Sequence, residues 1–339
     1  MKAIKIPQPF QLSIENIPTP TIKTPNDVLI KITSCGICGS DMGIWNGTNS
    51  LATYPRLIGH EFGGIVTETG SSVHTVKKGD LVSVDPVLSC GHCYACRIGR
   101  HNVCSSLEVL GVHRDGGFCE YVCVPESNVH KFHTAFDQSL LSMVEPFTIG
   151  VEINRRGGIT AGDKVLIMGS GPIGIAAMQV AKRNGASVMI TDLVASRLEK
   201  ARKMGADRTI LIPLQDLECE IMDFTDSEGI PVIVDTVCTP LSLEQAVQLA
   251  CPAGRIVVIG LKNQPSAISM ADITKKELTI VGSRLNCNCF DEVIEGFEDG
   301  SLHPETFVTH TFHYSQTEEA FQLIRQHPEE VLKAVIRFE

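Results

Sequence analysis

A glycine-rich turn between a buried strand and a helix is the feature that most constrains this chain. The apolar run Lys164–Met168 leads directly into Gly-Ser-Gly-Pro-Ile-Gly, and the residues that follow have helical apolar spacing. In such G-x-G-x-x-G turns the glycines permit a tight turn, close approach of a pyrophosphate and close helix–strand packing. A helix N-terminus also favours negative charge. We therefore predict a dinucleotide site formed by Gly169, Gly171, Pro172, Ile173 and Gly174.

The strand after this helix predicts which dinucleotide binds. The run 188–191 ends at Asp192, and a carboxylate there accepts hydrogen bonds from ribose hydroxyls and repels a 2′-phosphate. NAD is therefore favoured over NADP. We expect Arg197 to lie over the adenine ribose, although a solvated helix residue fits the same position. The remaining predicted cofactor contacts are Ile259, Leu261 and Ser283.

The alternation of strands and helices divides the chain into two domains, as expected for 339 residues. Short β-rich runs separated by glycine and proline indicate a β-rich unit over residues 1–150. From residue 163 strands alternate with helical segments, which indicates a Rossmann-type, doubly wound parallel sheet over 151–286. The fold class is therefore α/β. We expect the tail 287–339, with helices near 291–298 and 318–325 and a last strand at 333–338, to return to the first domain.

Composition excludes several classes of function. The net charge of −10 argues against a nucleic-acid partner, and the absence of an apolar run of membrane-spanning length argues against a membrane protein. The first residues lack the apolar core of a signal peptide, so we expect a cytoplasmic location. Thirteen cysteines, an odd number, favour metal binding over a disulfide framework.

Four of the cysteines form a compact motif with C-x2-C-x2-C-x7-C spacing. Four thiolates can surround one tetrahedral Zn²⁺ and leave no position for a substrate, so this metal would be structural. An iron–sulfur cluster is the chemical alternative. The predicted ligands are Cys90, Cys93, Cys96 and Cys104.

Three further elements carry the ligand types of an open, catalytic zinc site. They are Cys38 within Gly-Ile-Cys-Gly-Ser-Asp, His60 and Glu61 within Gly-His-Glu, and Glu145 within Val-Glu-Pro. A thiolate, an imidazole and a carboxylate together suit catalytic Zn²⁺. Taken singly, each residue has an ordinary structural alternative: a cysteine in the core, a histidine with a structural role, and a carboxylate at a helix end. Their joint occurrence ahead of a dinucleotide fold favours the metal site.

With Asp-Gly-Gly-Phe at 115–118, these motifs resemble the medium-chain, zinc-dependent alcohol dehydrogenase superfamily along essentially the whole chain. The chain is most similar to its polyol and threonine dehydrogenase branch, and within it to the group of starvation-sensing protein B and L-galactonate dehydrogenase. The segments carrying this closer similarity are 54–61, 84–94, 110–118, 145–147 and 282–286.

The resemblance implies a GroES-like catalytic domain, a Rossmann NAD domain, and two zinc ions per chain. It implies that Cys38, His60 and Glu145 hold the catalytic zinc, with Glu61 as an alternate ligand or a support behind the ligands. Ser40 would accept the substrate proton, although a helix N-cap is its alternative role. The family's next relay residue, a histidine, is replaced by Gly43. A homodimer or homotetramer is also implied.

The same resemblance implies a hexonate oxidised at C5, with L-gulonate to D-fructuronate as the leading candidate. L-galactonate, L-idonate, sorbitol and threonine are alternatives, and a non-catalytic, zinc-stabilised NAD-binding regulator is an alternative of another class. A buried substrate carboxylate needs a cation or several donors. Trp45 is predicted to wall the pocket, with core packing as its alternative, and the candidate carboxylate-binding residues are Arg284, Arg56, Arg114 and His113.

Overall fold

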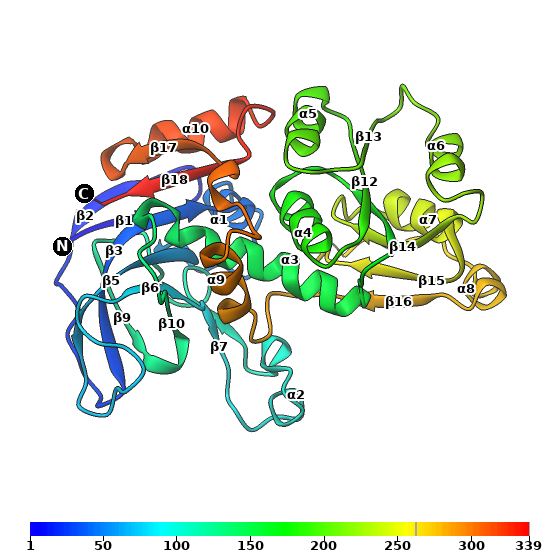
Figure 1. Cartoon of the computed structure of the whole chain (residues 1–339). Coiled ribbons are helices and arrows are strands. Elements are labelled where there is room, and N and C mark those ends of the chain that lie inside the picture. Colours follow the sequence, from blue (N-terminus) through cyan, green and yellow to red (C-terminus); the bar gives the residue numbers. More distant parts are fainter. Residues whose placement is uncertain (262, 339) are drawn as a thin grey trace. The chain divides into compact units, whose positions relative to one another are not determined.

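The computed structural model describes residues 1–261 and 263–338 (Figure 1). Its contacts separate the chain into two compact units, Met1–Glu145 with Cys287–Glu339, and Pro146–Asn286. The sequence pattern places the first junction at residue 150, whereas the contacts place it at Glu145, in the first turn of helix α3 (Val144–Gly157). Each unit is described by itself below.

The first unit is built on one large sheet. The strand order is β10-β6-β5-β3-β18-β17, and β9 also pairs with β3. Strand β3 is almost wholly buried and is central to the sheet, as its run of valine, leucine and isoleucine indicates. The strands are β3 (Asp27–Ile37), β5 (Glu61–Thr69), β6 (Leu81–Val84), β9 (Tyr121–Pro125), β10 (Val129–Lys131), β17 (Val308–His313) and β18 (Lys333–Arg337).

Smaller elements complete this unit. One is a three-stranded sheet of order β2-β1-β4, and another is the two-stranded pair β7-β8. These strands are β1 (Lys2–Ile6), β2 (Ser13–Asn16), β4 (Arg56–Leu57), β7 (Val87–Leu88) and β8 (Glu108–Val109). The helices are α1 (Gly39–Trp45), α2 (Tyr94–Arg97), α9 (Phe290–Glu298) and α10 (Thr317–Gln326).

The C-terminal tail returns to the first unit, as predicted. Strand β18 runs antiparallel to β3, with Ala334 opposite Ile37 and Ile336 opposite Cys35. Helices α9 and α10 confirm the two amphipathic helices expected in this tail. Strand β17 was not predicted, because its residues are mostly polar and only partly buried and so lack a clear apolar alternation.

The second unit confirms the predicted parallel sheet. Six strands pair in the order β13-β12-β11-β14-β15-β16, all in parallel. The edge strand β13 was not predicted, because it is short and begins with a polar Arg-Thr pair. The strands are β11 (Lys164–Met168), β12 (Ser187–Asp192), β13 (Arg208–Leu211), β14 (Ile230–Asp235), β15 (Ala250–Val258) and β16 (Thr279–Gly282).

Helices cover this sheet and close its core. Helix α4 packs on β11 and β12, α5 on β12 and β13, and α7 on β14 and β15. The side chains between them include Leu166, Met189 and Ile233, each fully buried. The helices are α4 (Pro172–Arg183), α5 (Ala195–Lys203), α6 (Leu217–Phe224), α7 (Pro240–Leu249) and α8 (Met270–Lys276).

Among the described residues, none of the helices combines the length and the apolar character that crossing a bilayer requires.

Candidate metal centre and dinucleotide site

Cys38, His60 and Glu61 meet at one end of the large sheet. Cys38 follows β3, and Glu61 begins β5 directly after His60. The pairing of Gly36 with Glu61 brings these strand ends together. The Sγ atom, an imidazole nitrogen and a carboxylate oxygen all lie within 4.8 Å of one another. The structure therefore assembles a donor set of sulfur, nitrogen and oxygen that suits Zn²⁺.

Glu145 lies outside this three-residue cluster, but the charges of His60 and Glu61 influence its pKa. Its side chain belongs to the first turn of α3 and is buried, with 4% of the residue exposed. Burial raises the pKa of Glu145 to about 8, while attraction to His60 opposes the shift and repulsion from Glu61 adds to it. A carboxylate in such surroundings gains from a nearby cation, and a ligand role for Glu145 stays a prediction.

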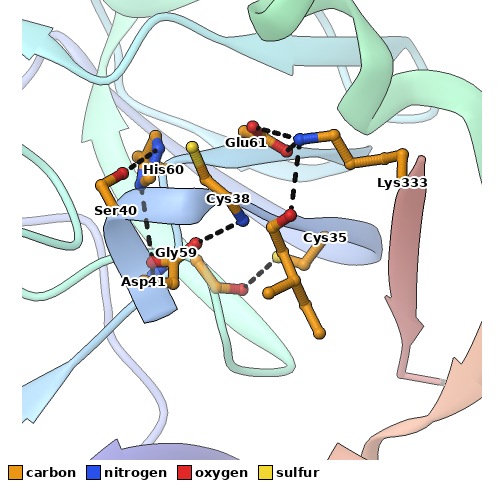
Figure 2. A network of polar contacts seen from close by, with 10 residues as sticks. Cys35, Cys38, Ser40, Asp41, Gly59, His60, Glu61 and Lys333 are labelled. Atoms are coloured by element: carbon orange, nitrogen blue, oxygen red, sulfur yellow. Dashed lines mark hydrogen bonds and ion pairs between the residues drawn. The ribbon is translucent and has the colours of Figure 1, made fainter. Parts of the chain in front are cut away.

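Asp41, which carried no predicted role, supports the ligands from behind (Figure 2). It is fully buried on α1; its Oδ2 accepts the Cys38 N–H at 2.9 Å, and its Oδ1 lies 3.6 Å from His60 Nδ1. Burial opposes a charge on His60, but Asp41 and then Cys38 outweigh it and raise the pKa of His60 well above its ordinary value. A carboxylate behind a ligating histidine fixes the tautomer and orientation of the imidazole.

Ser40 lies on the other side of the imidazole. Its Oγ is 3.2 Å from His60 Nε2, while Asp41 faces Nδ1 (Figure 2). The Nε2 atom is therefore the imidazole nitrogen that faces a hydroxyl, and the predicted proton acceptor lies directly beside the metal-binding cluster.

Lys333 was missed entirely by sequence reasoning. Its Nζ donates to both carboxylate oxygens of Glu61, at 2.6 and 2.8 Å, and the two side chains are 3% and 2% exposed (Figure 2). Burial opposes a charge on Lys333, but the carboxylate of Glu61 and then Cys38 outweigh it and raise the pKa of this lysine. Gly36 leaves space for the pair, because a Cβ there would lie 2.1 Å from Glu61 Oε2.

The four predicted lobe cysteines also come together. Their sulfur atoms lie within 4.8 Å of one another, with Cys93 3.5 Å from Cys96 and 3.9 Å from Cys104. Tetrahedral zinc with bonds of about 2.3 Å places its sulfurs about 3.8 Å apart. Backbone N–H groups donate to the thiolates and, led by the one at Cys96, lower the pKa of Cys93 to about 5. The lobe therefore fits a single structural ion.

In the second unit, a cavity of about 640 Å³ opens where the glycine-rich turn meets the ends of the strands. Leu261 and Ser283 are absent from its lining, the former being 75% exposed and the latter buried. The predicted contacts that do line it are Gly169, Gly171, Pro172, Ile173, Gly174, Asp192, Arg197 and Ile259.

The three glycines of the turn have distinct physical roles. Gly169 has a φ of 97°, which favours glycine, and a Cβ at Gly174 would lie 2.0 Å from the Gly169 carbonyl oxygen. A Cβ at Gly171 would meet no protein atom within 4 Å, although this residue lines the cavity. Its missing side chain therefore leaves room for a ligand rather than for the protein's own packing.

The predicted substrate residues differ in burial and in their polar partners. Trp45 is 1% exposed and packs edge-on against Phe10 and Phe321, which favours core packing over a pocket wall. Two arginines already have acidic partners, Arg56 with Asp115 at 3.2 Å and Arg114 with Glu108 at 2.6 Å.

His113 and Arg284 have different surroundings. The Nδ1 atom of His113 accepts the Val109 N–H at 3.1 Å, which occupies one of its nitrogens. Arg284 belongs to the other unit, follows strand β16 and is exposed.

Two models of known protein families match this chain. Residues 24–134 match the alcohol dehydrogenase GroES-like domain, and residues 172–299 match the zinc-binding dehydrogenase domain. The chain therefore belongs to the zinc-binding alcohol dehydrogenase family.

Two curated relatives and one solved structure are similar over nearly all of their length. The starvation-sensing protein RspB of Escherichia coli K12 is 42% identical, with 100% of this chain and 99% of RspB covered. The L-galactonate-5-dehydrogenase of the same strain is 32% identical, with 92% of each chain covered. A crystal structure of an alcohol dehydrogenase (rspB) from E. coli CFT073 with NADH is 41% identical, covers 100% and 99% of the two chains, and has a TM-score of 0.94.

Proposed function

We propose that this protein oxidises a secondary alcohol of a sugar acid with NAD as the hydride acceptor. The observation that carries the proposal is the Cys38–His60–Glu61 cluster in a chain that also has a cavity lined by the glycine-rich turn. A similar alcohol dehydrogenase was crystallised with NADH, which supports NAD as the cofactor. Cys38, His60 and Glu145 would hold a catalytic zinc, and the four lobe cysteines a structural one.

Several residues around the proposed zinc would assist removal of the proton from the substrate hydroxyl. A zinc ion held here would supply the Lewis acidity that lowers the pKa of an alcohol, and the nicotinamide would take the hydride. Ser40 Oγ lies beside His60 and is placed to accept the hydroxyl proton. Asp41, with Oδ1 3.6 Å from Nδ1, would orient the imidazole of His60, and Lys333 holds Glu61 through an ion pair. Since Gly43 has no side chain, water or another group would carry the proton onward from Ser40.

L-gulonate, oxidised at C5 to D-fructuronate, is our leading substrate. Support comes from the similar L-galactonate-5-dehydrogenase, which acts on a sugar acid. Arg284 is the proposed partner of the substrate carboxylate, since a guanidinium binds a carboxylate through two parallel hydrogen bonds. L-galactonate, L-idonate, sorbitol and threonine are the competing substrates within the same chemistry.

A substrate panel tests this proposal directly. Zinc-loaded protein is mixed with NAD or NADP and each candidate, and formation of the reduced cofactor is followed by absorbance. We expect turnover with NAD and a hexonate, loss of turnover in Cys38→Ser, and retained turnover in Cys219→Ser, an exposed cysteine outside both clusters. Absence of turnover across the panel, with zinc confirmed by metal analysis, favours the non-catalytic regulator instead.

We also propose a homodimer or homotetramer. Strands β13 and β16 are the two edges of the six-stranded sheet, and an edge strand can pair with a strand of another chain. Light scattering measures the mass of the particle in solution, and a monomer at micromolar concentration would contradict this assignment.

A further inference from the structure

A serine hydroxyl inside the glycine-rich turn holds the carboxylate of Asp192. Ser170 lies between Gly169 and Gly171 and is fully buried. Its backbone N–H and its Oγ–H both donate to Asp192 Oδ2, at 2.9 and 2.8 Å. The other carboxylate oxygen, Oδ1, accepts the Val194 N–H at 2.9 Å. Both oxygens of Asp192 are therefore fixed by groups of the protein itself.

This arrangement leaves Oδ1 as the oxygen with more capacity for a ligand. A carboxylate oxygen offers about two lone-pair positions, and those of Oδ2 are both used by Ser170. Oδ1 has one protein donor and so retains a position for a hydroxyl group. Because Asp192 lines the cavity, this position is available to a ribose hydroxyl.

The backbone N–H of Ser170 is also not free to bind a phosphate. Its N–H is used by Asp192, the N–H of Gly169 donates to the Thr191 carbonyl at 2.9 Å, and Pro172 has no N–H. The N–H groups of Ile173 and Gly174 lie in the first turn of α4 and have no partner within the helix. They are therefore the donors that would bind a phosphate. The turn thus separates its donors into one set for phosphate and one for Asp192.

We propose that Ser170 is a positioning residue that sets the preference for NAD over NADP by holding Asp192 toward the ribose. This inference rests on the proposed function, since it requires a dinucleotide in the cavity. A carboxylate held in place accepts the 2′-hydroxyl of NAD and repels the 2′-phosphate of NADP. Without the Ser170 hydroxyl, Asp192 keeps only the backbone N–H groups of Ser170 and Val194, so its carboxylate is held less firmly and both effects weaken.

A double-mutant cycle tests the inference. The dissociation constants of NADH and NADPH are measured by fluorescence for wild type, Ser170→Ala, Asp192→Asn and the double variant. We expect Ser170→Ala to lower the NADH/NADPH preference about tenfold, as loss of a hydrogen bond to a charged group typically does. In the Asp192→Asn background the same substitution should leave the ratio unchanged, because Ser170 acts through the carboxylate.

Two further variants separate this role from general damage. Ser142→Ala also truncates a fully buried serine, one whose hydroxyl has no partner in the described part of the chain, and should leave the ratio as in wild type. Ser170→Cys keeps a similar side-chain size with a much weaker donor, and should shift the ratio in the same direction as Ser170→Ala. It also serves as the test if the alanine variant does not fold.

The outcomes distinguish this inference from the function on which it rests. If wild type binds NADH in preference to NADPH but Ser170→Ala and Ser170→Cys keep that preference, the positioning role is wrong and the proposed function stands. If Ser170→Ala changes the ratio equally in the Asp192→Asn background, Ser170 does not act through Asp192. Wild type that binds neither dinucleotide overturns both.

Discussion

Lys333 Nζ donates to both carboxylate oxygens of Glu61, at 2.6 and 2.8 Å, in surroundings from which water is nearly excluded. The lysine begins the strand β18, and the glutamate begins β5 (Figure 2). The pair lies beside Cys38, so the lysine influences which negative groups are available to a metal. Its removal therefore has consequences for both stability and metal binding.

Lys333→Met should lower the free energy of unfolding by about 3–5 kcal/mol, because it leaves the Glu61 charge buried without a partner. Denaturant unfolding of the purified variant measures this change. The double variant Lys333→Met with Glu61→Gln should recover most of the loss, since no buried charge remains. A single variant as stable as wild type would show that Glu61 is satisfied by other groups.

Asp41→Asn should weaken zinc binding at the catalytic site about 10- to 100-fold, as loss of a carboxylate behind a ligating histidine commonly does. The physical reason is that an amide is a poorer partner for His60 Nδ1, which lies 3.6 Å from Asp41 Oδ1. Competition with a chelator, followed by metal analysis, measures the affinity. Unchanged zinc affinity would mean that Asp41 only caps helix α1.

Ser40→Ala should reduce kcat about 10²- to 10⁴-fold while the KM for NAD stays near its wild-type value, since the variant lacks a proton acceptor beside the cluster. Steady-state kinetics over a range of pH make the comparison. Ser139→Ala, a half-buried serine at the N-terminus of a 3₁₀ turn, is a matched control and should keep wild-type kcat. Wild-type kcat in Ser40→Ala as well would exclude the hydroxyl from the relay.

Cys93→Ser should remove one of the two expected zinc ions per chain and leave the other. Its sulfur is close to those of Cys96 and Cys104. Without it, three thiolates remain, and they cannot complete the four-coordinate shell of a structural zinc. Metal analysis gives the stoichiometry, and hydrogen exchange over residues 90–104 should rise because the metal stabilises that loop. Retention of both ions in the variant would refute the lobe as a zinc site.

Glu126→Gln should flatten the acid dependence of stability. Backbone N–H groups of Thr75 and His74 donate to Glu126 Oε1 at 2.7 and 2.6 Å and lower the pKa of this carboxyl from 4.5. A lowered pKa stabilises the fold above the unfolded value, and this contribution is lost as pH falls through the folded value. Unfolding midpoints measured from pH 6 down to about pH 3 test this, with the exposed Glu295→Gln as control.

Several parts of the fold and the site could be predicted because their signals are local in the sequence. The glycine turn is such a case, since Gly169, Gly171 and Gly174 act within one strand–turn–helix unit. The cysteine lobe is another, because its ligands come from a single short segment. Strands β13 and β17 escaped prediction because polar residues and partial exposure obscure their apolar alternation.

By itself, the sequence determined the two-domain organisation, the glycine-rich turn and the kinds of metal-binding side chain. The reason is that the spacing of residues within short motifs and the periodicity of apolar residues specify each of these features. Only the tertiary structure decided that Lys333 neutralises Glu61, that Asp41 faces His60, and that Ser170 holds Asp192. These pairings depend on which strands lie side by side. The pairing of β18 with β3 joins segments from opposite ends of the chain, and no local pattern encodes the partner of a charge that is buried only once the sheet has formed.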